Sequence, residues 1–162
     1  MLSKSFYLIE LELISILFIE KLIMQEKFNR VYTAGAFDCL HIGHIRLLKA
    51  AKKRGKNLVV AVSTNELIFD YKNKFPFQSL EERIEIVSSI KYVDEVVVQI
   101  SRDNKLKDCL KNKCDCMVVG SDWEGTDFFK KLEKEFESKG LKIIYHPYTK
   151  GISTTIIRSN IK

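Results

Sequence analysis

Two histidines three positions apart are the residues of this chain best suited to chemistry. His41 and His44 end the stretch GAFDCLHIGH, residues 35–44, where a strand-like run gives way to a helical one. At a helix start their rings lie on one side, beside unpaired backbone N–H groups and the positive end of the helix dipole, which attract phosphate. Asp38 is placed to fix the loop, and Gly43 clears space between the rings. We predict that this segment stabilises charge developing on a phosphoryl group.

The elements that must position these histidines alternate regularly between strands and helices. β-Branched and continuous apolar runs predict strands at 30–35, 57–63, 95–100, 116–120 and 142–145. Apolar spacing predicts helices at 42–54, 80–90, 103–112 and 128–138, and a short one after Ser153. Ser79 and Glu82 have the spacing of a capping box for the second helix. The alternation predicts an α/β fold: a single-domain, Rossmann-like three-layer sandwich with a mostly parallel five-stranded sheet.

The composition is that of a soluble globular protein. The chain has 162 residues, 46% hydrophobic and 30% charged, which suits one domain with its own core. Lys and Arg outnumber Asp and Glu by 27 to 21, and the net charge of +6 favours anionic partners without choosing among nucleic acid, nucleotide, metabolite and membrane surface. The cysteines are few for the length and come with no secretory context, which indicates a reducing, cytoplasmic compartment; they are Cys39, Cys109, Cys114 and Cys116. They include neither a CxxC pair nor a nearby histidine pair, which argues against zinc.

Residues 2–23 are apolar enough to raise the question of a membrane segment. Three glutamates interrupt the run, namely Glu10, Glu12 and Glu20. The longest uncharged stretch, residues 13–19, is far shorter than the ~20 residues of a membrane-spanning helix. A signal peptide would need a strong basic start and a small-residue cleavage site, which this segment lacks. We therefore expect no stable membrane insertion.

Two interpretations of residues 1–23 remain open. They form either an N-terminal extension that packs as a short amphipathic helix, or a segment that is not translated because Met24 is the true start. We favour Met24, since MQEKFNRVYTAG has the character of an ordinary start running into a first strand. In both cases residues 24–162 form the domain.

The motifs together resemble those of one enzyme superfamily. HIGH, residues 41–44, matches the HxGH signature of the nucleotidyltransferases, which transfer a nucleotidyl group from a nucleoside triphosphate and release pyrophosphate. Over residues 30–160 the chain is more closely similar to the bacterial glycerol-3-phosphate cytidylyltransferases. Three further features carry this resemblance: Arg83 upstream of YVDEV (92–96), GSDWEG (120–125) and GISTT (151–155).

The resemblance implies a role for each matching residue. His41 and His44 would stabilise the α-phosphate and the leaving oxygen. Lys72 and Lys74, on the loop that leaves the second strand, would meet the triphosphate and the acceptor phosphate, and Arg83 would lie near the acceptor phosphate. These five are the catalytic candidates, and the last three are also the acceptor-binding ones. The nucleotide-binding candidates are the two histidines with Ala36, Phe37, Asp38, Gly120, Asp122, Trp123, Thr149, Ser153 and Thr154.

Two of these stretches also have simpler interpretations. Asp122 would accept a hydrogen bond from the amino group of cytosine while Trp123 supplies a flat apolar surface, but a lone tryptophan also commonly caps a core. GISTT brings hydroxyl groups to the start of the last helix, where they suit phosphate, and a plain helix cap would look the same.

One position departs from the family pattern. Where the family commonly has arginine before Thr-x-Gly-Ile-Ser-Thr-Thr, this chain has Tyr148. A phenol cannot replace a bidentate cation that grips triphosphate oxygens. Either Lys150 compensates or the nucleotide is held differently. His146, on the last strand, is interpreted as structural.

The resemblance implies transfer of CMP from CTP to a small phosphorylated alcohol. Glycerol 3-phosphate is the favoured acceptor, giving CDP-glycerol and pyrophosphate for cell-surface polymer synthesis. Mg²⁺ would bind mainly through the CTP phosphates, and the protein would be a cytoplasmic homodimer. The alternatives are an adenylyltransferase of the same superfamily and a cytidylyltransferase acting on ethanolamine, choline or sugar phosphate. We expect no nucleic-acid partner, because no RNA-binding motif or aromatic-interleaved basic patch is present.

Overall fold

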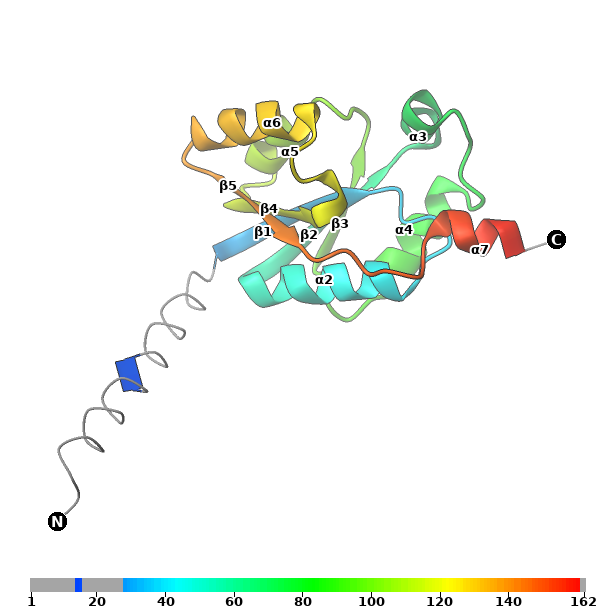
Figure 1. Ribbon diagram of the computed structural model, residues 1–162, viewed down its shortest axis with the longest axis horizontal. Coiled ribbons are helices and arrows are strands. Elements are labelled where there is room, and N and C mark those ends of the chain that lie inside the picture. Colours follow the sequence, from blue (N-terminus) through cyan, green and yellow to red (C-terminus); the bar gives the residue numbers. More distant parts are fainter. Residues whose placement is uncertain (1–13, 16–27, 161–162) are drawn as a thin grey trace, which may run out of the picture.

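Five parallel strands form the centre of the molecule (Figure 1). The computed structural model describes residues 14–15 and 28–160, so the predicted extension and the Met24 start lie outside the described residues except at 14–15. The strands pair in the order β3-β2-β1-β4-β5. Their bounds are β1 (Phe28–Gly35), β2 (Gly55–Ser63), β3 (Glu95–Gln99), β4 (Cys116–Gly120) and β5 (Lys142–His146). The predicted Rossmann-like α/β fold is confirmed.

Helices cover both faces of the sheet (Figure 1). Those in the described part of the chain are α2 (Ile42–Arg54), α3 (Asn65–Lys72), α4 (Leu80–Ser88), α5 (Lys105–Lys111), α6 (Asp127–Glu137) and α7 (Thr154–Asn160), with a 3₁₀ turn η1 (Ser121–Trp123). α2 and α4 pack on one face, and α5 and α6 on the other. Each helix predicted from the sequence is present within two residues at either end. Ser79 and Glu82 form the predicted capping box of α4.

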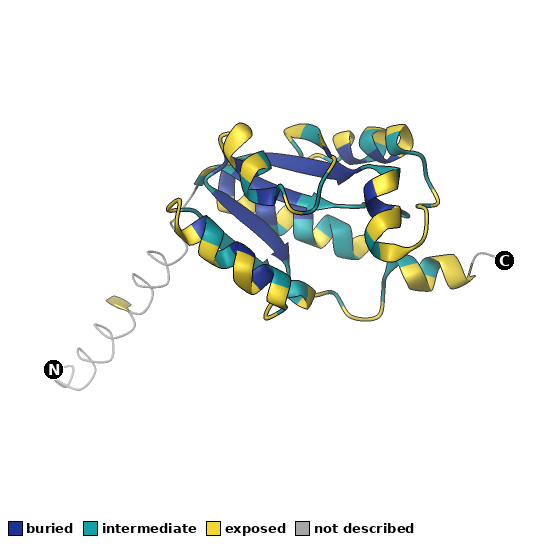
Figure 2. Cartoon of the chain, turned by 90° about the horizontal axis from the view of Figure 1, so that it is seen from above, coloured by how far each residue is buried: buried dark blue, intermediate teal, exposed yellow. Residues whose placement is uncertain are grey.

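The strands supply two apolar cores, one on each side of the sheet. In β2, Leu58, Val60 and Val62 face the α2 and α4 side, whereas Val59 and Ala61 face the α5 and α6 side. All five side chains are fully buried, which explains why this run is continuously apolar. Figure 2 shows the buried residues concentrated in the strands and the exposed ones on the outer faces of the helices.

The helix α3 is the main element that the sequence does not predict. Thr64 begins it by accepting a hydrogen bond from the Leu67 amide, and Asn73 ends it in left-handed backbone at a φ of 51°. The prediction of a loop at Lys72 is therefore wrong, because this residue is the last of α3, whereas Lys74 does lie in the connection to α4. The helix is hard to predict because its two buried residues are adjacent and show no helical period.

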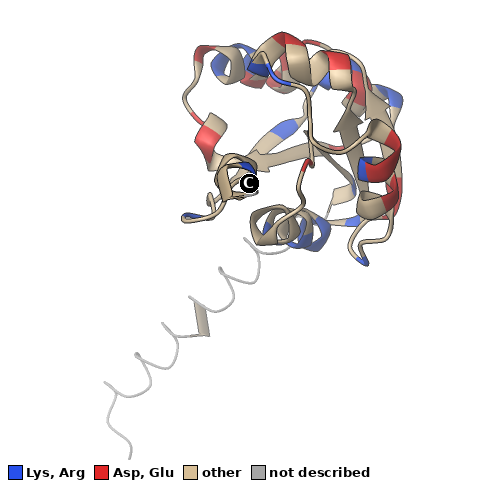
Figure 3. Ribbon diagram, turned by 90° about the vertical axis from the view of Figure 1, so that its right-hand side faces the viewer, with Lys and Arg blue, Asp and Glu red and all other residues tan. Residues whose placement is uncertain are grey.

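The strand order reverses between β1 and β4. The chain runs outward from β1 to β2 and β3, then returns to place β4 and β5 on the other side of β1. In sheets of this kind ligands bind beyond the carboxyl ends of the strands at the reversal. The HIGH stretch follows β1 and the GSDWEG stretch follows β4, so both predicted motifs meet at this edge. In the view of Figure 3, basic and acidic residues are interspersed along the outer helices.

Candidate active site

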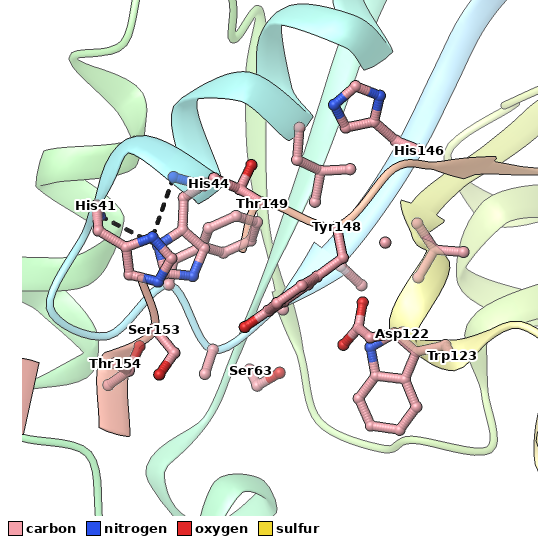
Figure 4. Close-up of a pocket in the computed structure, with 18 of the residues that line it drawn as sticks. His41, His44, Ser63, Asp122, Trp123, His146, Tyr148, Thr149, Ser153 and Thr154 are labelled. Carbon is pink, nitrogen blue, oxygen red and sulfur yellow. Dashed lines mark hydrogen bonds between the residues drawn. The ribbon is translucent and has the colours of Figure 1, made fainter. Parts of the chain in front are cut away.

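A cleft of about 290 Å³ lies at the carboxyl ends of the strands (Figure 4). Its wall is formed by the β1–α2 loop, α3, the segment after β3, the segment after β4 and the segment from β5 to α7. The structure brings most of the predicted site residues together here: Ala36, Phe37, His41, His44, Lys72, Gly120, Asp122, Trp123, Thr149, Ser153 and Thr154. These residues come from segments far apart in the sequence, so the fold assembles the site.

The two histidines form a stacked pair at the start of α2. Their ring centroids lie 3.9 Å apart with an interplanar angle of 28°. The Gly43 amide donates to His41 Nδ1 at 3.1 Å, and the His41 amide donates to His44 Nδ1 at 3.3 Å (Figure 4). Because each Nδ1 accepts a backbone hydrogen bond, each neutral imidazole carries its proton on Nε2. Both rings line the cleft and present N–H donors there.

Burial keeps the histidine pair uncharged. Burial, helped by the neighbouring His41 and Lys72, lowers the pKa of His44 to about 3. Burial also lowers the pKa of His41. At neutral pH the pair therefore acts through two neutral N–H donors and the end of the helix dipole. Formal positive charge in the cleft wall comes from Lys72, whose side chain is exposed, and from Arg102 and Lys105.

Gly43 and Phe37 hold the two imidazole rings in place through close contacts. A Cβ at Gly43 would lie 2.9 Å from two ring atoms of His41, so only glycine leaves that ring its place. Phe37 adopts a φ of 51°, and its ring packs against His44 with centroids 5.4 Å apart. Left-handed backbone at a buried phenylalanine is strained, and such strain is concentrated at functional sites.

The wall after β4 carries the predicted base-binding residues. The Asp122 carboxylate folds back over Gly120, where a Cβ would lie 2.3 Å from Oδ1. Trp123 packs on the core residue Phe129 with ring centroids 5.7 Å apart. The Arg102 guanidinium covers the Trp123 ring at 5.0 Å. Trp123 is thus both part of the core margin and part of the cleft wall, and its contact with a base stays a prediction.

The segment between β5 and α7 closes the cleft on the side of the histidines. The Tyr148 amide donates to Ser121 Oγ at 3.0 Å, and its hydroxyl donates to the Ile152 carbonyl at 3.4 Å. Ser153 Oγ accepts from the Ile156 amide, as expected of a helix cap. Thr154 Oγ1 donates to the Asp38 carbonyl at 2.8 Å, which ties GISTT to the loop that carries the histidines.

Three predicted site residues do not line the cleft: Asp38, Lys74 and Arg83. Asp38 is buried and accepts hydrogen bonds from the amides of Phe77 and Gln78, so it fixes the loop as predicted. Lys74 is an exposed residue of the α3–α4 connection. The predicted roles of Lys74 and Arg83 at the acceptor phosphate stay predictions.

Arg83 is fully buried behind the cleft. Its guanidinium donates four hydrogen bonds, to the carbonyls of Ala36, Ser63 and Gln78 and to Asn65 Oδ1. These bonds join the β1–α2 loop to the end of β2. In this arrangement Arg83 braces the floor of the site.

Sequence reasoning missed the residues that line the cleft beyond β2 and β3. They are Ser63, Tyr71, Gln99, Arg102 and Lys105. The rule that ligands lie beyond strand ends would have singled out Ser63 and Gln99, the last residues of their strands. Nothing in the sequence singles out Arg102 or Lys105. Arg102 lies in the connection between β3 and α5, and Lys105 is the first residue of α5.

The cleft offers no cluster of metal ligands within the part of the chain that the structure describes. No group of three or more His, Cys, Asp or Glu side chains is placed there to hold a metal ion. Asp122 is the one carboxylate among the described residues of the cleft wall. Likewise, none of the described helices is long and apolar enough to cross a membrane.

Known proteins share this fold and a substantial part of this sequence. The chain belongs to the cytidylyltransferase-like family, whose model matches residues 32–160. Within it, the chain is 42% identical over 133 residues to the glycerol-3-phosphate cytidylyltransferase of Bacillus subtilis, which covers 82% of this chain and 97% of that protein. The predicted resemblance to this group is confirmed.

Two other relatives mark the breadth of the family. An FAD synthase of Pyrococcus abyssi is 37% identical over 115 residues, covering 70% of this chain and 76% of that protein. The crystal structure of the lipopolysaccharide core biosynthesis protein from Thermoplasma volcanium matches with a TM-score of 0.63 and 28% identity, over 77% of this chain and 99% of that one. The same fold therefore occurs in relatives whose names describe different activities.

Proposed function

We propose that this protein is a cytidylyltransferase that transfers CMP from CTP to glycerol 3-phosphate, giving CDP-glycerol and pyrophosphate for the synthesis of cell-surface polymers. The observation that carries the proposal is the pair of neutral imidazoles at the start of α2, linked through the Thr154–Asp38 hydrogen bond to GISTT. The choice of substrates is supported by the 42% identity to a glycerol-3-phosphate cytidylyltransferase.

The reaction is an in-line displacement at the α-phosphorus of CTP. A phosphate oxygen of the acceptor forms the new P–O bond, the bond to the β-phosphate breaks, and pyrophosphate leaves. The nucleophile is already an anion, so neither histidine has to remove a proton. His41 and His44 donate their Nε2–H groups to the α-phosphate and the leaving oxygen, and Lys72 adds positive charge at the mouth. Positioning and charge offset the repulsion between the two phosphate groups.

Mg²⁺ is proposed to enter with CTP. When bound it neutralises charge on the triphosphate. Since the described cleft wall holds a single carboxylate, Asp122, the donor set fits a cation carried by phosphate oxygens and water rather than by a protein cage.

We also propose a cytoplasmic homodimer that associates through β3. This strand lies at an edge of the sheet, and its side of the molecule exposes Val98 and Ile100, at 46% and 72% of their full accessibility. An edge strand with exposed apolar side chains is suited to pairing with a second chain. All four cysteines are free thiols, as is usual in a reducing compartment. The interspersed charge of the outer helices argues against a nucleic-acid partner (Figure 3).

Adenylyl transfer is the second candidate function. It is favoured by the 37% identity to an FAD synthase over 70% of this chain. An acceptor with a different alcohol is a third possibility, since an ethanolamine-phosphate cytidylyltransferase of Mus musculus is 33% identical over 80% of this chain and is covered over 32% of its own length.

Pyrophosphate release separates these candidates. CTP, ATP, UTP and GTP are each combined, with Mg²⁺, with glycerol 3-phosphate, ethanolamine phosphate, choline phosphate and sugar phosphates. Release with CTP and glycerol 3-phosphate alone is the expected result. Turnover with CTP and another alcohol phosphate would keep the reaction and change the acceptor, and turnover with ATP would replace the proposal by adenylyl transfer.

A further inference from the structure

The last helix, α7, is attached to the rest of the fold without an apolar core. Within its described residues, 154–160, no side chain is buried, and neither of the two cores includes one of them. In Figure 1, α7 lies at the edge of the molecule, outside the layers that cover the sheet. A segment with few buried apolar contacts opens at a low cost in free energy. The polar contacts of α7 therefore decide how firmly it is held.

Arg158 makes two of these polar contacts with one guanidinium group. Its Nη1 donates to the Phe75 carbonyl at 2.9 Å and lies 3.6 Å from Asp38 Oδ2, with which it forms an ion pair. The Asp38 side chain is only 5% accessible, and salt screens an ion pair with a buried partner less than one at the open surface. The Phe75 ring in turn stacks on Phe69 of α3, with ring centroids 4.5 Å apart. Arg158 thus joins α7 to the α3–α4 connection and to the loop that carries the histidines.

Asp38 is the residue at which these three segments meet. Its Oδ1 accepts hydrogen bonds from the Phe77 and Gln78 amides of the α3–α4 connection. Its carbonyl accepts from Thr154 at the start of α7, and its Oδ2 faces Arg158, four residues further along the same helix. Residues four apart lie on the same side of a helix, one turn from each other. Two contacts one turn apart fix the direction of the helix, whereas a single contact leaves it free to pivot.

We infer that Arg158 is a positioning residue for the nucleotide: it holds α7 in place, so that Ser153 and Thr154 stay in the cleft wall beside the histidine pair. Arg158 does not itself line the cleft, so it acts through α7. This inference deepens the proposed function and rests on it for the identity of the nucleotide. Without the anchor, the arrangement that binds nucleotide is populated for only part of the time, and the apparent affinity falls by that fraction. Bound nucleotide restores the arrangement, so the rate at saturation is kept.

Steady-state kinetics with CTP and glycerol 3-phosphate test this role. Arg158→Ala removes both contacts, and Arg158→Lys keeps a cation opposite Asp38. Ser159→Ala is the matched control, because it removes an exposed hydroxyl whose bond to the Ile156 carbonyl stays within the helix. We expect Arg158→Ala to raise the KM for CTP about tenfold, with kcat within about twofold of that of the unmodified protein.

The conservative variant and the control sharpen this measurement. Arg158→Lys should recover most of the affinity for CTP, and Ser159→Ala should match the unmodified protein. An unchanged KM for CTP in Arg158→Ala overturns the inference. A rise in KM confined to glycerol 3-phosphate overturns it as well, because Arg158 would then serve the acceptor.

Amide hydrogen exchange tests the anchor without any turnover. The amides of Ile156 and Ile157 donate to the Oγ and the carbonyl of Ser153 in the first turn of α7. A helix this short is not stable once it leaves the fold. Without nucleotide, these amides should therefore exchange about tenfold faster in Arg158→Ala than in the unmodified protein, whereas the amides of β2 should exchange equally in both. Added CTP should reduce the difference in α7.

The outcomes of the exchange experiment separate the inference from its alternatives. Equal exchange of α7 in the two proteins overturns the inference. Faster exchange of β2 in Arg158→Ala overturns it too, because Arg158 would then support the whole fold rather than position α7. Absence of pyrophosphate release in the unmodified protein, with the exchange as expected, would instead reject the proposed reaction.

Discussion

The imidazole rings of His41 and His44 stack 3.9 Å apart, and each is oriented by a backbone N–H that donates to its Nδ1. One motif thus builds the start of α2 and the phosphate-facing donors together, because His41 is the N-cap and His44 closes the capping box. The hydrogen bonds that begin the helix also fix the tautomers that the chemistry needs. Structure and function are therefore coupled at these two residues.

Replacement of His44 by alanine should reduce turnover by about 10²–10³-fold, because one preorganised donor to the reacting phosphate is lost. The variant also loses the hydrogen bond to the His41 amide, which should cost about 1 kcal/mol of stability. Pyrophosphate release with CTP and glycerol 3-phosphate measures the first effect, and urea denaturation the second. Lys49→Ala, which removes an exposed residue of the same helix, is the matched control. Turnover like that of the unmodified protein in folded His44→Ala would contradict the assignment.

Acid should destabilise the protein through the same residue. The pKa of His44 is about 3 in the folded chain and near 6.5 when the residue is solvated, so between these values the unfolded chain binds more protons. The free energy of unfolding must then fall as the pH decreases below 6.5, by up to about 1.4 kcal/mol per pH unit from His44. His44→Asn, which cannot titrate, should show a shallower decline between pH 7 and 5. Parallel stability curves for the two proteins would show that His44 is not held neutral by the fold.

The sequence predicts the sheet and the phosphate-binding loop because their signals are local. Buried strands such as β2 are continuous apolar runs, and the spacing of His41 and His44 at a strand–helix junction is visible within ten residues. The helix α3 was missed because its short length and adjacent buried residues give no period. The histidine pair at the strand–helix junction could thus be predicted from the sequence alone.

The other part of the site depends on tertiary contacts that no spacing encodes. The resemblance singles out Arg83 for the acceptor phosphate, but no spacing predicts that carbonyl oxygens from three separate positions hold it in a fully buried place. Arg102 and Lys105 read as ordinary charges of a polar segment, and only the packing of α3, η1 and α6 around them turns them into a wall of the cleft. Burial of a charge is decided by its partners, and these are distant in sequence.

Arg83→Lys should destabilise the fold by about 3 kcal/mol or more. Lysine keeps the charge but cannot reach all four oxygens, so carbonyl groups of Ala36 and Ser63 lose their donor in a buried place. Urea denaturation should therefore show a lower midpoint, and the KM for both substrates should rise together because the floor of the cleft loosens. A variant of unchanged stability, with a raised KM for glycerol 3-phosphate alone, would assign Arg83 to direct contact with the acceptor phosphate.

Tyr148→Arg should strengthen nucleotide binding. Tyr148 lines the cleft beside GISTT with 49% of its surface exposed, so an arginine fits there without repacking the core. A guanidinium can grip two phosphate oxygens where the phenol offers a single neutral hydroxyl, which should lower the KM for CTP about tenfold with a smaller effect on kcat. Tyr148→Phe is the control, since the Tyr148 hydroxyl donates only a long bond of 3.4 Å to the Ile152 carbonyl. If Tyr148→Arg leaves the KM unchanged while Lys150→Ala raises it, the nucleotide is held by Lys150 and the lost arginine has been replaced.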